Sequence, residues 1–136
     1  MRFTYAPVSY GGYILLEPRA PVVFTNPTNG NSLSLKSLVD SGAARTVLHP
    51  DLAEVLGIEL DRLETLPISS ADHDSRGYDF ALNVHLVGAA RHEFLIPCAF
   101  FPGLHTDAVL GRDVFFDRYR IVFEQYHYQF QITPRV

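Results

Sequence analysis

Leu38-Val39-Asp40-Ser41-Gly42-Ala43 is the stretch of this chain from which its fold can be worked out. Two apolar residues lead a single acid, Asp40, into a turn of small residues. Asp, Ser and Gly are favoured in turns, because they bond the nearby backbone or leave it free to bend. The stretch occurs once in 136 residues. Two carboxylates about 3 Å apart share one proton, so an acid–base pair built on Asp40 requires a second copy of the chain.

Strand-like segments lie on both sides of this turn. They are short and apolar, and Gly, Pro, Asn and Asp separate them, which is typical of strands joined by turns. The predicted strands cover residues 13–16, 22–25, 34–40, 46–48, 63–68, 78–87, 93–100, 108–111, 121–123 and 126–132. Residues 26–31 predict a hairpin loop, and the polar residues 69–77 predict the tip of a longer hairpin.

A short helix is predicted between two of these strands. Asp51 and Glu54 favour the positive N-terminal end of a helix, and Gly57 ends it. A second helical turn is predicted at residues 112–116. Many short strands with one or two short helices in one domain favour a β-barrel or a β-sandwich.

The composition argues against several classes of protein. An apolar content of 47%, with ten Phe and seven Tyr, is inconsistent with disorder. The net charge is −4 and no basic block or stripe occurs, which argues against a nucleic-acid partner. The sequence shows neither a signal peptide nor a membrane-spanning apolar run. We therefore expect a cytoplasmic protein with no membrane partner.

Cysteine and histidine usage bears on thiol and metal chemistry. Cys98 is the only cysteine, which excludes an intrachain disulfide, and its apolar neighbours predict a buried, inert thiol. The six histidines are scattered, and none shows the helical spacing of a zinc site. Asp72-His73-Asp74 could ligate a cation, but an exposed loop tip accounts for these residues without a ligand. No metal site is predicted.

Asp-Ser-Gly by itself says little about chemistry, since a plain turn at a strand end uses the same residues. Three further features support a functional role for Asp40. Apolar or small neighbours keep the acid partly away from water, and Thr46 is placed to hydrogen-bond the loop back on itself. Downstream of the polar-tipped hairpin, the sequence reads Ala108-Val109-Leu110-Gly111-Arg112-Asp113.

This set of motifs, in this order, resembles the retropepsin-like aspartic peptidases. That family has an Asp-Thr/Ser-Gly-Ala loop, a flap hairpin, and an apolar-apolar-Gly-Arg-Asn/Asp segment that leads into a short helix. The resemblance spans about residues 13–132 and is nearest to the small cellular, bacterial-type members. It implies a mostly β fold: one domain over residues 1–136, built as a closed β-barrel of the retropepsin (acid protease) type with one or two short helices.

The resemblance implies roles for individual residues. Asp40 would be the catalytic carboxylate. The active-site loop would be supported by Ser41, Gly42, Ala43, Thr46, Gly111 and Arg112. The flap that closes over substrate and excludes water would contain Ala71, Asp72, His73, Gly77 and Tyr78. One departure concerns Ala44, which stands where viral members carry an acid that pairs with the downstream arginine. The acceptor for Arg112 is therefore open.

The resemblance also implies a partner and a reaction. The expected activity is that of a homodimeric aspartic endopeptidase that needs no cofactor or metal and cleaves an extended peptide or protein. In the family the chain ends form a sheet across the dimer interface. The stripe of Tyr126, Tyr128 and Phe130, predicted to be one face of a strand, is expected to bury against the partner.

Two alternatives stay open: a catalytically silent peptide-binding or dimerisation module on the same fold, and a metal-dependent hydrolase using His and Asp side chains.

Overall fold

The computed structural model describes residues 1–69 and 74–135. These residues form strands β1 (Arg2–Thr4), β2 (Ala6–Tyr10), β3 (Tyr13–Glu17), β4 (Arg19–Thr25), β5 (Ser32–Val39), β6 (Thr46–Leu48), β7 (Thr65–Ser69), β8 (Asp74–Leu86), β9 (Phe94–Phe100), β10 (Ala108–Leu110), β11 (Tyr119–Glu124) and β12 (Gln129–Pro134). The helical segments are α1 (Leu52–Val55), η1 (Leu60–Arg62), η2 (Ala90–His92), η3 (Arg112–Phe116) and η4 (Gln125–His127). None of these described helices has the length and apolar character needed to cross a membrane. The predicted mostly β fold is confirmed.

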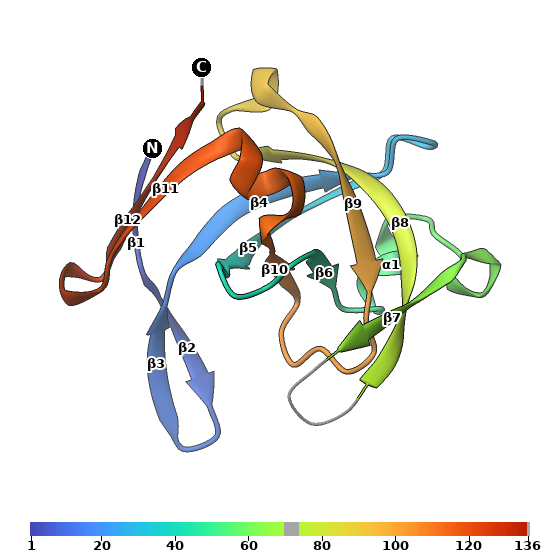
Figure 1. Cartoon of the computed structure of the whole chain (residues 1–136), viewed down its shortest axis with the longest axis horizontal. Coiled ribbons are helices and arrows are strands. Elements are labelled where there is room, and N and C mark those ends of the chain that lie inside the picture. Colours follow the sequence, from blue (N-terminus) through green and yellow to red (C-terminus); the bar gives the residue numbers. More distant parts are fainter. Residues whose placement is uncertain (70–73, 136) are drawn as a thin grey trace.

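Six strands close into a barrel. Their order is β4-β5-β10-β6-β9-β8, and a further pairing between β4 and β8 completes the ring. β5 pairs with β10, and β6 with β9, in parallel, whereas the other barrel pairs are antiparallel. The end of β5 and the end of β10 consequently lie side by side in the middle of the molecule (Figure 1).

Alternating side chains of the barrel strands fill the interior. In β4, Ala20, Val22 and Phe24 are fully buried, and the residues between them are partly exposed. This period of two is the pattern of a strand with one face on the core. β8 and β9 supply a second buried set: Leu82, Val84, Leu86, Ile96, Cys98 and Phe100. Cys98 is buried, as predicted from the sequence, and this burial raises the pKa of its thiol to about 12.

Most of the strands predicted for the barrel are confirmed. Segments 22–25, 34–40, 46–48, 93–100 and 108–111 correspond to β4, β5, β6, β9 and β10. The predicted loop over residues 26–31 joins β4 to β5, and the Asn26 N–H donates to the Asn31 carbonyl at 2.8 Å across its base. Gly30 turns the chain there with a φ of 79°.

The same loop also contacts the end of helix α1. α1 is shorter than the sequence predicted, and Gly57 ends it with a φ of 68°, a conformation that favours glycine. The Leu56 carbonyl at this end accepts hydrogen bonds from Asn26 Nδ2 at 2.9 Å and from Asn29 Nδ2 at 3.1 Å. Two side-chain amides therefore satisfy a carbonyl that the helix itself leaves free.

The two ends of the chain meet in a separate three-stranded sheet, β1-β12-β11. Phe3 lies opposite Phe130, and their rings stack with centroids 5.1 Å apart. The prediction of one strand over residues 126–132 is wrong, because η4 and Tyr128, with a φ of 53°, form a turn before β12 begins. Tyr126 is 78% exposed whereas Phe130 is buried, so the stripe of Tyr126, Tyr128 and Phe130 does not form one strand face.

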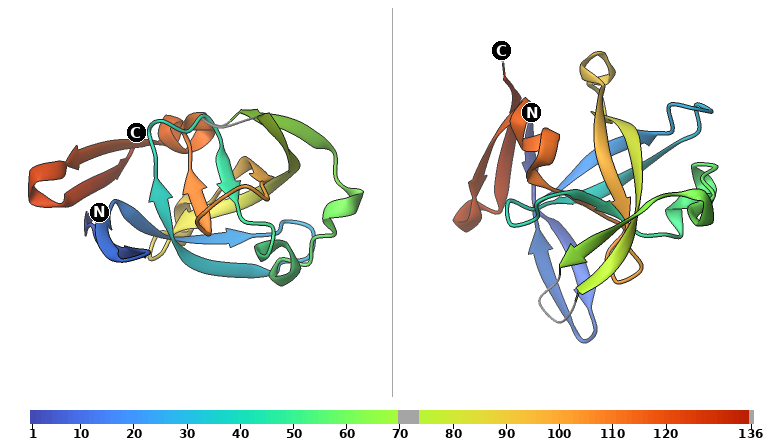
Figure 2. Two further views of the ribbon diagram at one scale, coloured as in Figure 1. Left: turned by 90° about the horizontal axis from the view of Figure 1, so that it is seen from below. Right: turned by 45° about the vertical axis from the view of Figure 1, so that its right-hand side comes forward.

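A two-stranded ribbon precedes the barrel. β3 contains the predicted strand 13–16, whereas β1 and β2 were not predicted. β2 and β3 pair from Ala6 opposite Glu17 to Tyr10 opposite Tyr13, and Gly11 begins the two-residue turn with a φ of 58°. A Gly-Gly pair between two strand-like runs is a hairpin signal. The ribbon projects from the barrel in Figure 1 and in the right-hand view of Figure 2.

Candidate active site

Asp40 lies where β5 ends, in the loop that leads to β6. Val39 pairs with Leu110 of the parallel strand β10, and the Asp40 N–H donates to the Leu110 carbonyl at 3.1 Å. The backbone of Asp40 therefore continues the hydrogen-bonded ladder of two core strands. Val39 and Leu110 are buried, and the Asp40 side chain is half-buried at the end of this ladder. The apolar approach seen in the sequence is thus a rigid support for one carboxylate.

The Asp40 carboxylate folds back onto its own loop. Oδ1 accepts the Gly42 N–H at 2.8 Å, and the Asp40 backbone carbonyl accepts the Ala43 N–H at 3.2 Å. A Cβ on residue 42 would lie only 3.2 Å from this Oδ1. Glycine therefore keeps the space beside the carboxylate free, while the backbone orients one of the two carboxylate oxygens.

The segment that follows β10 holds the Asp40 loop from one side. The Arg112 N–H donates to the Ala43 carbonyl at 2.8 Å, and the Asp113 N–H donates to the Ala44 carbonyl at 2.9 Å. Two successive carbonyls of the loop are therefore bonded to a segment that is far away in the sequence. The shape of the loop depends on the folded barrel and not only on its own turn residues.

Thr46 and Gly111 make a buried contact beneath the loop. The Gly111 N–H donates to Thr46 Oγ1 at 3.2 Å, and Thr46 is fully buried. The hydroxyl thus bonds the neighbouring segment, whereas the sequence had suggested a bond within its own loop. A Cβ on Gly111 would lie 2.2 Å from the Arg45 carbonyl oxygen. The two segments meet backbone to backbone, which only glycine permits.

The Arg112 side chain also contacts the loop. Its Nη1 donates to the Ser41 carbonyl at 2.8 Å. Ala44 has no carboxylate with which Arg112 could pair. The backbone carbonyl of Ser41, in the same loop, is the acceptor of the Arg112 side chain instead. Arg45 reaches in the opposite direction, and its Nη2 pairs with Asp79 of β8 at 3.1 Å. The loop is in this way linked both to the segment after β10 and to the barrel wall.

A cavity of about 360 Å³ lies beside the loop. Its lining is mostly apolar and consists of Gly42, Ala43, Ala44, Arg45, Val47, Pro67 and Ile68. The cavity therefore lies between the Asp40 loop and strand β7. Apolar cavities with a few polar groups at the edge are typical of sites for small ligands or side chains.

The predicted flap residues fall into two groups. Three lie outside the described residues: Ala71, Asp72 and His73. Gly77 and Tyr78 lie on β8, in the stem where this strand pairs with β7. A Cβ on Gly77 would lie 2.4 Å from Ile68 Cδ1 and 3.2 Å from the Phe100 carbonyl. Gly77 thus allows the stem to pack closely against a residue that lines the cavity.

The sequence of the chain matches one protein family over most of this region. The profile of the family described as "gag-polyprotein putative aspartyl protease" matches residues 27–116, which is more than half of the chain. The match includes both Asp40 and the segment from Gly111 to Asp113. The chain belongs to this aspartyl protease family.

One solved structure confirms the predicted fold for this aspartyl protease family member. A retropepsin-like aspartic protease from Rickettsia conorii superposes with a TM-score of 0.65 at 19% identity, over 98% of each chain. The protease of simian foamy virus (mac) has a TM-score of 0.45 at 15% identity, over 70% of this chain and 88% of that chain. No curated protein sequence matches the chain. The fold is of the retropepsin type.

Several residues around the loop were not singled out from the sequence. Val47, Pro67 and Ile68 line the cavity, and Asp79 pairs with Arg45. Only the alternation within the predicted strands hinted at the first three residues. Nothing local connects Arg45 with Asp79, because the order of strands around the barrel brings them together.

Two histidines in the described residues each lie close to one acid. His85 Nδ1 lies 3.3 Å from Glu93, and His49 Nδ1 lies 3.5 Å from Asp51. Over residues 1–69 and 74–135, no three His, Cys, Asp or Glu side chains gather in a way that could hold a metal ion. The metal-dependent alternative has no ligand cluster in this part of the chain.

Proposed function

We propose that this aspartyl protease family member is an active endopeptidase that works as a homodimer, with Asp40 as the catalytic carboxylate of each copy. The Asp40 loop is the observation that carries the proposal. It holds a half-buried carboxylate at the end of a core strand and is bonded to the segment after β10. The loop occurs once per chain, and the chemistry requires two carboxylates that share a proton.

A water molecule between the two Asp40 carboxylates would be the nucleophile. The ionised carboxylate takes a proton from the water, and the protonated one donates a hydrogen bond to the scissile carbonyl, which becomes tetrahedral. The two groups titrate as a pair, and only the form that carries one proton is active. Activity is therefore expected to be greatest at mildly acidic pH. This chemistry requires no metal and no organic cofactor.

An extended peptide suits the surroundings of Asp40. Gly42 presents bare backbone beside the carboxylate, so the backbone of a substrate can approach closely. The neighbouring cavity, lined by Val47, Pro67 and Ile68, accepts an apolar side chain of that substrate. We expect cleavage sites to carry at least one large apolar residue near the scissile bond.

Cleavage of a diverse peptide library between about pH 4 and about pH 7 tests the proposal. Wild-type protein is compared with Asp40→Asn and with Asp61→Asn, which neutralises an exposed acid of η1 away from the site. We expect cleavage by the wild type and by Asp61→Asn, no cleavage by Asp40→Asn, and the mass of a dimer for all three proteins by light scattering. Full activity of Asp40→Asn would contradict the proposal.

The same experiment distinguishes the silent module. A well-formed dimer that binds peptides but cleaves none of them would support that alternative. Inhibition of cleavage by a statine-type mimic of the tetrahedral intermediate would support the peptidase, because such a mimic binds through the shared-proton carboxylate pair.

A further inference from the structure

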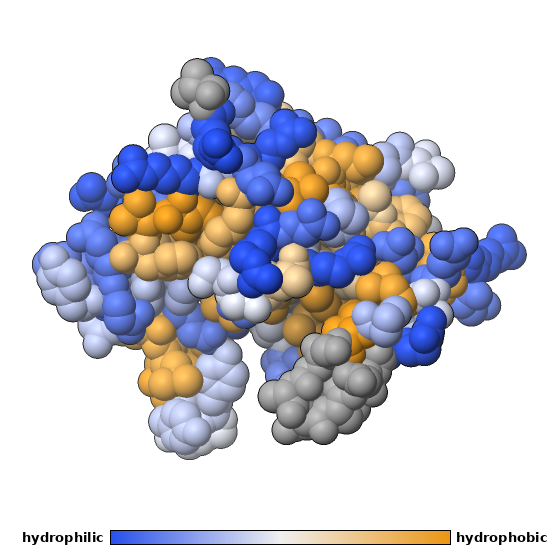
Figure 3. Space-filling view, in the orientation of Figure 1, coloured by the Kyte–Doolittle hydropathy of each residue, from blue (hydrophilic) through white to orange (hydrophobic). Residues whose placement is uncertain are grey.

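The ribbon β2–β3, called the arm below, is an unusual structure for a monomer. It consists of two strands joined by the Gly11-Gly12 turn. A two-stranded ribbon is only marginally stable in water when no third layer covers it. The arm projects from the barrel, and Figure 3 shows hydrophobic side chains on it at the lower left of the view.

Four consecutive apolar side chains on the arm face solvent. Tyr13, Ile14, Leu15 and Leu16 are 66%, 67%, 49% and 42% exposed. Isolated exposed apolar residues are common, but here two exposed apolar side chains lie on each face of one projecting ribbon, Tyr13 and Leu15 on one face and Ile14 and Leu16 on the other. Strand alternation places Ile14 and Leu16 on one face of the arm, opposite Ser9 and Pro7 respectively. We refer to this side as the Ile14 face.

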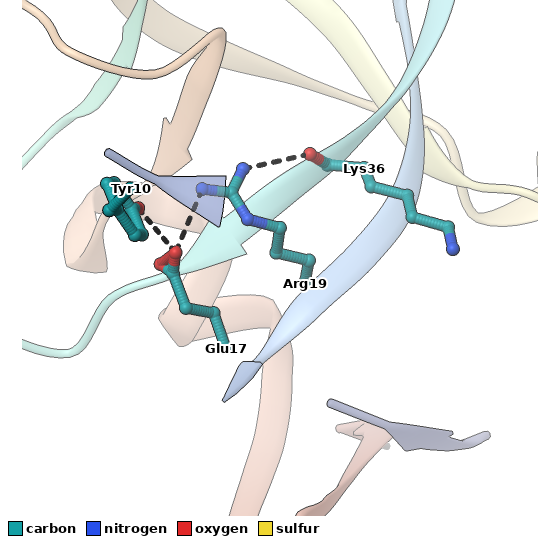
Figure 4. A network of polar contacts seen from close by, with 4 residues as sticks. All are labelled: Tyr10, Glu17, Arg19 and Lys36. Carbon is teal, nitrogen blue, oxygen red and sulfur yellow. Dashed lines mark hydrogen bonds and ion pairs between the residues drawn. The ribbon is translucent and has the colours of Figure 1, made fainter. Parts of the chain in front are cut away.

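The other face of the arm carries a polar network that fixes the arm at its base (Figure 4). The Tyr10 hydroxyl donates to the Glu17 carboxylate, and Arg19 Nη2 contacts the same Oε1 at 3.4 Å. Arg19 Nη1 also donates to the Lys36 carbonyl on β5 at 3.4 Å. The Arg19 and Glu17 side chains are only 9% and 15% exposed. The arm is therefore joined to the barrel in a defined direction.

The base of the arm lies next to the catalytic loop. The Val39 N–H donates to the Pro18 carbonyl at 2.9 Å, and Arg19 pairs with Leu38. Asp40 is the next residue after Val39. The base of the arm therefore lies about one strand spacing, roughly 5 Å, from the end of β5, the strand that leads into Asp40. Two Asp40 side chains in a shared-proton pair are about 3 Å apart. A second copy close enough to form that pair also comes within reach of the arm.

We infer that the Ile14 face of the arm packs against the second copy of the chain and contributes to the dimer that completes the active site. This inference rests on the proposed homodimeric function. We choose a second copy as the partner because the arm begins beside Asp40, the residue that must pair with Asp40 of that copy. In a two-fold dimer the contact occurs twice, once for each arm, so two anchored ribbons bury their apolar faces on association.

Sedimentation velocity over a range of protein concentrations tests this inference. All proteins carry Asp40→Asn, so that self-cleavage cannot occur and the result does not depend on catalysis. Ile14→Ser with Leu16→Ser is compared with Val55→Ser and Leu95→Ser, whose side chains are 56% and 52% exposed on α1 and β9. We expect the arm variant to raise the dimer dissociation constant about tenfold or more, and the control variant to leave it unchanged. The control variant should keep the parent melting temperature, and the arm variant should keep it at concentrations where the parent is also monomeric.

Equal dissociation constants for the arm variant and the parent would overturn the inference, as would a parent chain that stays monomeric at every concentration. In the wild-type background, the arm variant should lose activity at low protein concentration and regain it at high concentration. A raised KM with an unchanged dimer dissociation constant would place substrate on the arm instead of a second copy. A dimer that the arm variant loosens but that cleaves no peptide would support the arm contact and reject the peptidase.

Discussion

Gly111 has no room for a side chain, because the backbone of Arg45 occupies the space where a Cβ would lie. We predict that Gly111→Ala lowers the free energy of unfolding by at least about 2 kcal/mol, since backbone atoms must shift to accept the methyl group. The shift would also move the Arg112 and Asp113 N–H groups that hold the Asp40 loop. Peptide cleavage should therefore fall together with stability, as measured by urea unfolding and a peptide assay.

Gly12→Ala is the matched control for this prediction. Nothing lies within 4 Å of a Cβ built on Gly12, and this glycine does not have a positive φ. It should leave the free energy of unfolding close to that of the wild type. A Gly111→Ala protein as stable as Gly12→Ala would show that the close approach of the two segments is not needed.

Cys98 makes the stability of the barrel depend on alkaline pH. Its pKa is raised to about 12 by burial, whereas the thiol of the unfolded chain titrates near its ordinary value. Below about pH 7.5 both states are protonated, and this contribution to stability is complete. Between about pH 8 and about pH 12 the unfolded chain binds fewer protons, so the free energy of unfolding falls as pH rises.

Urea unfolding at several alkaline pH values measures this effect. We expect a shallower loss of stability for Cys98→Ser, whose hydroxyl does not titrate in this range. Part of the slope should remain, because burial also raises the pKa of Tyr5 and Tyr119. Identical slopes for the wild type and Cys98→Ser would contradict the assignment of a buried, protonated thiol.

At the scale of single residues, the sequence identified Asp40 and its neighbours but not all of their contacts. The motif itself is local, so Asp40, Gly42 and Arg112 could be named from the order of residues. Thr46 was expected to bond its own loop, whereas it accepts from Gly111. Partners of this kind depend on which strands become neighbours around the barrel, and nothing near Thr46 in the sequence specifies them.

Helix α1 and the loop before β5 form one connected element through Asn26. This side chain is buried, accepts the Thr28 N–H at 2.9 Å and donates to the Leu56 carbonyl. We predict that Asn26→Ala lowers the free energy of unfolding by about 1–3 kcal/mol, because the Leu56 carbonyl loses its buried donor and the part-buried Thr28 N–H loses its acceptor. Asn29→Ala removes a second donor to Leu56 at an exposed position, where water can replace the amide.

Thermal unfolding of both variants provides the comparison. The melting temperature should fall clearly more for Asn26→Ala than for Asn29→Ala. The opposite order, or two equal effects, would mean that burial of Asn26 does not make its hydrogen bonds more important than those of Asn29.

At the scale of elements, patterns within a few residues were predictive and pairings across the whole chain were not. The hairpin loop 26–31 and the end of α1 at Gly57 follow from local turn and capping chemistry. β1 is three residues long and pairs with β12 at the far end of the sequence, so no local pattern predicts it. Alternating aromatic residues after position 125 suggested a strand, but Tyr128 turns the chain instead.

At the scale of the whole molecule, β1 already pairs with β12 of the same chain. Among the described strands, the outer edges of the terminal sheet are therefore those of β1 and β11. A sheet that continues into a second copy would have to use one of these edges. The arm offers a separate apolar contact beside Asp40. The sequence could indicate the family and the fold, but a surface that fits a second copy is visible only after folding.

The measurement that tests the paired-carboxylate site most directly is the activity of mixtures of wild-type and Asp40→Asn chains at constant total concentration. If one water is activated between two Asp40 side chains, only dimers of two wild-type chains cleave peptide. Activity should then fall as the square of the wild-type fraction, and an equal mixture should keep about one quarter of the full rate. A linear fall, with about one half retained, would show that one Asp40 suffices and would contradict the dimeric site.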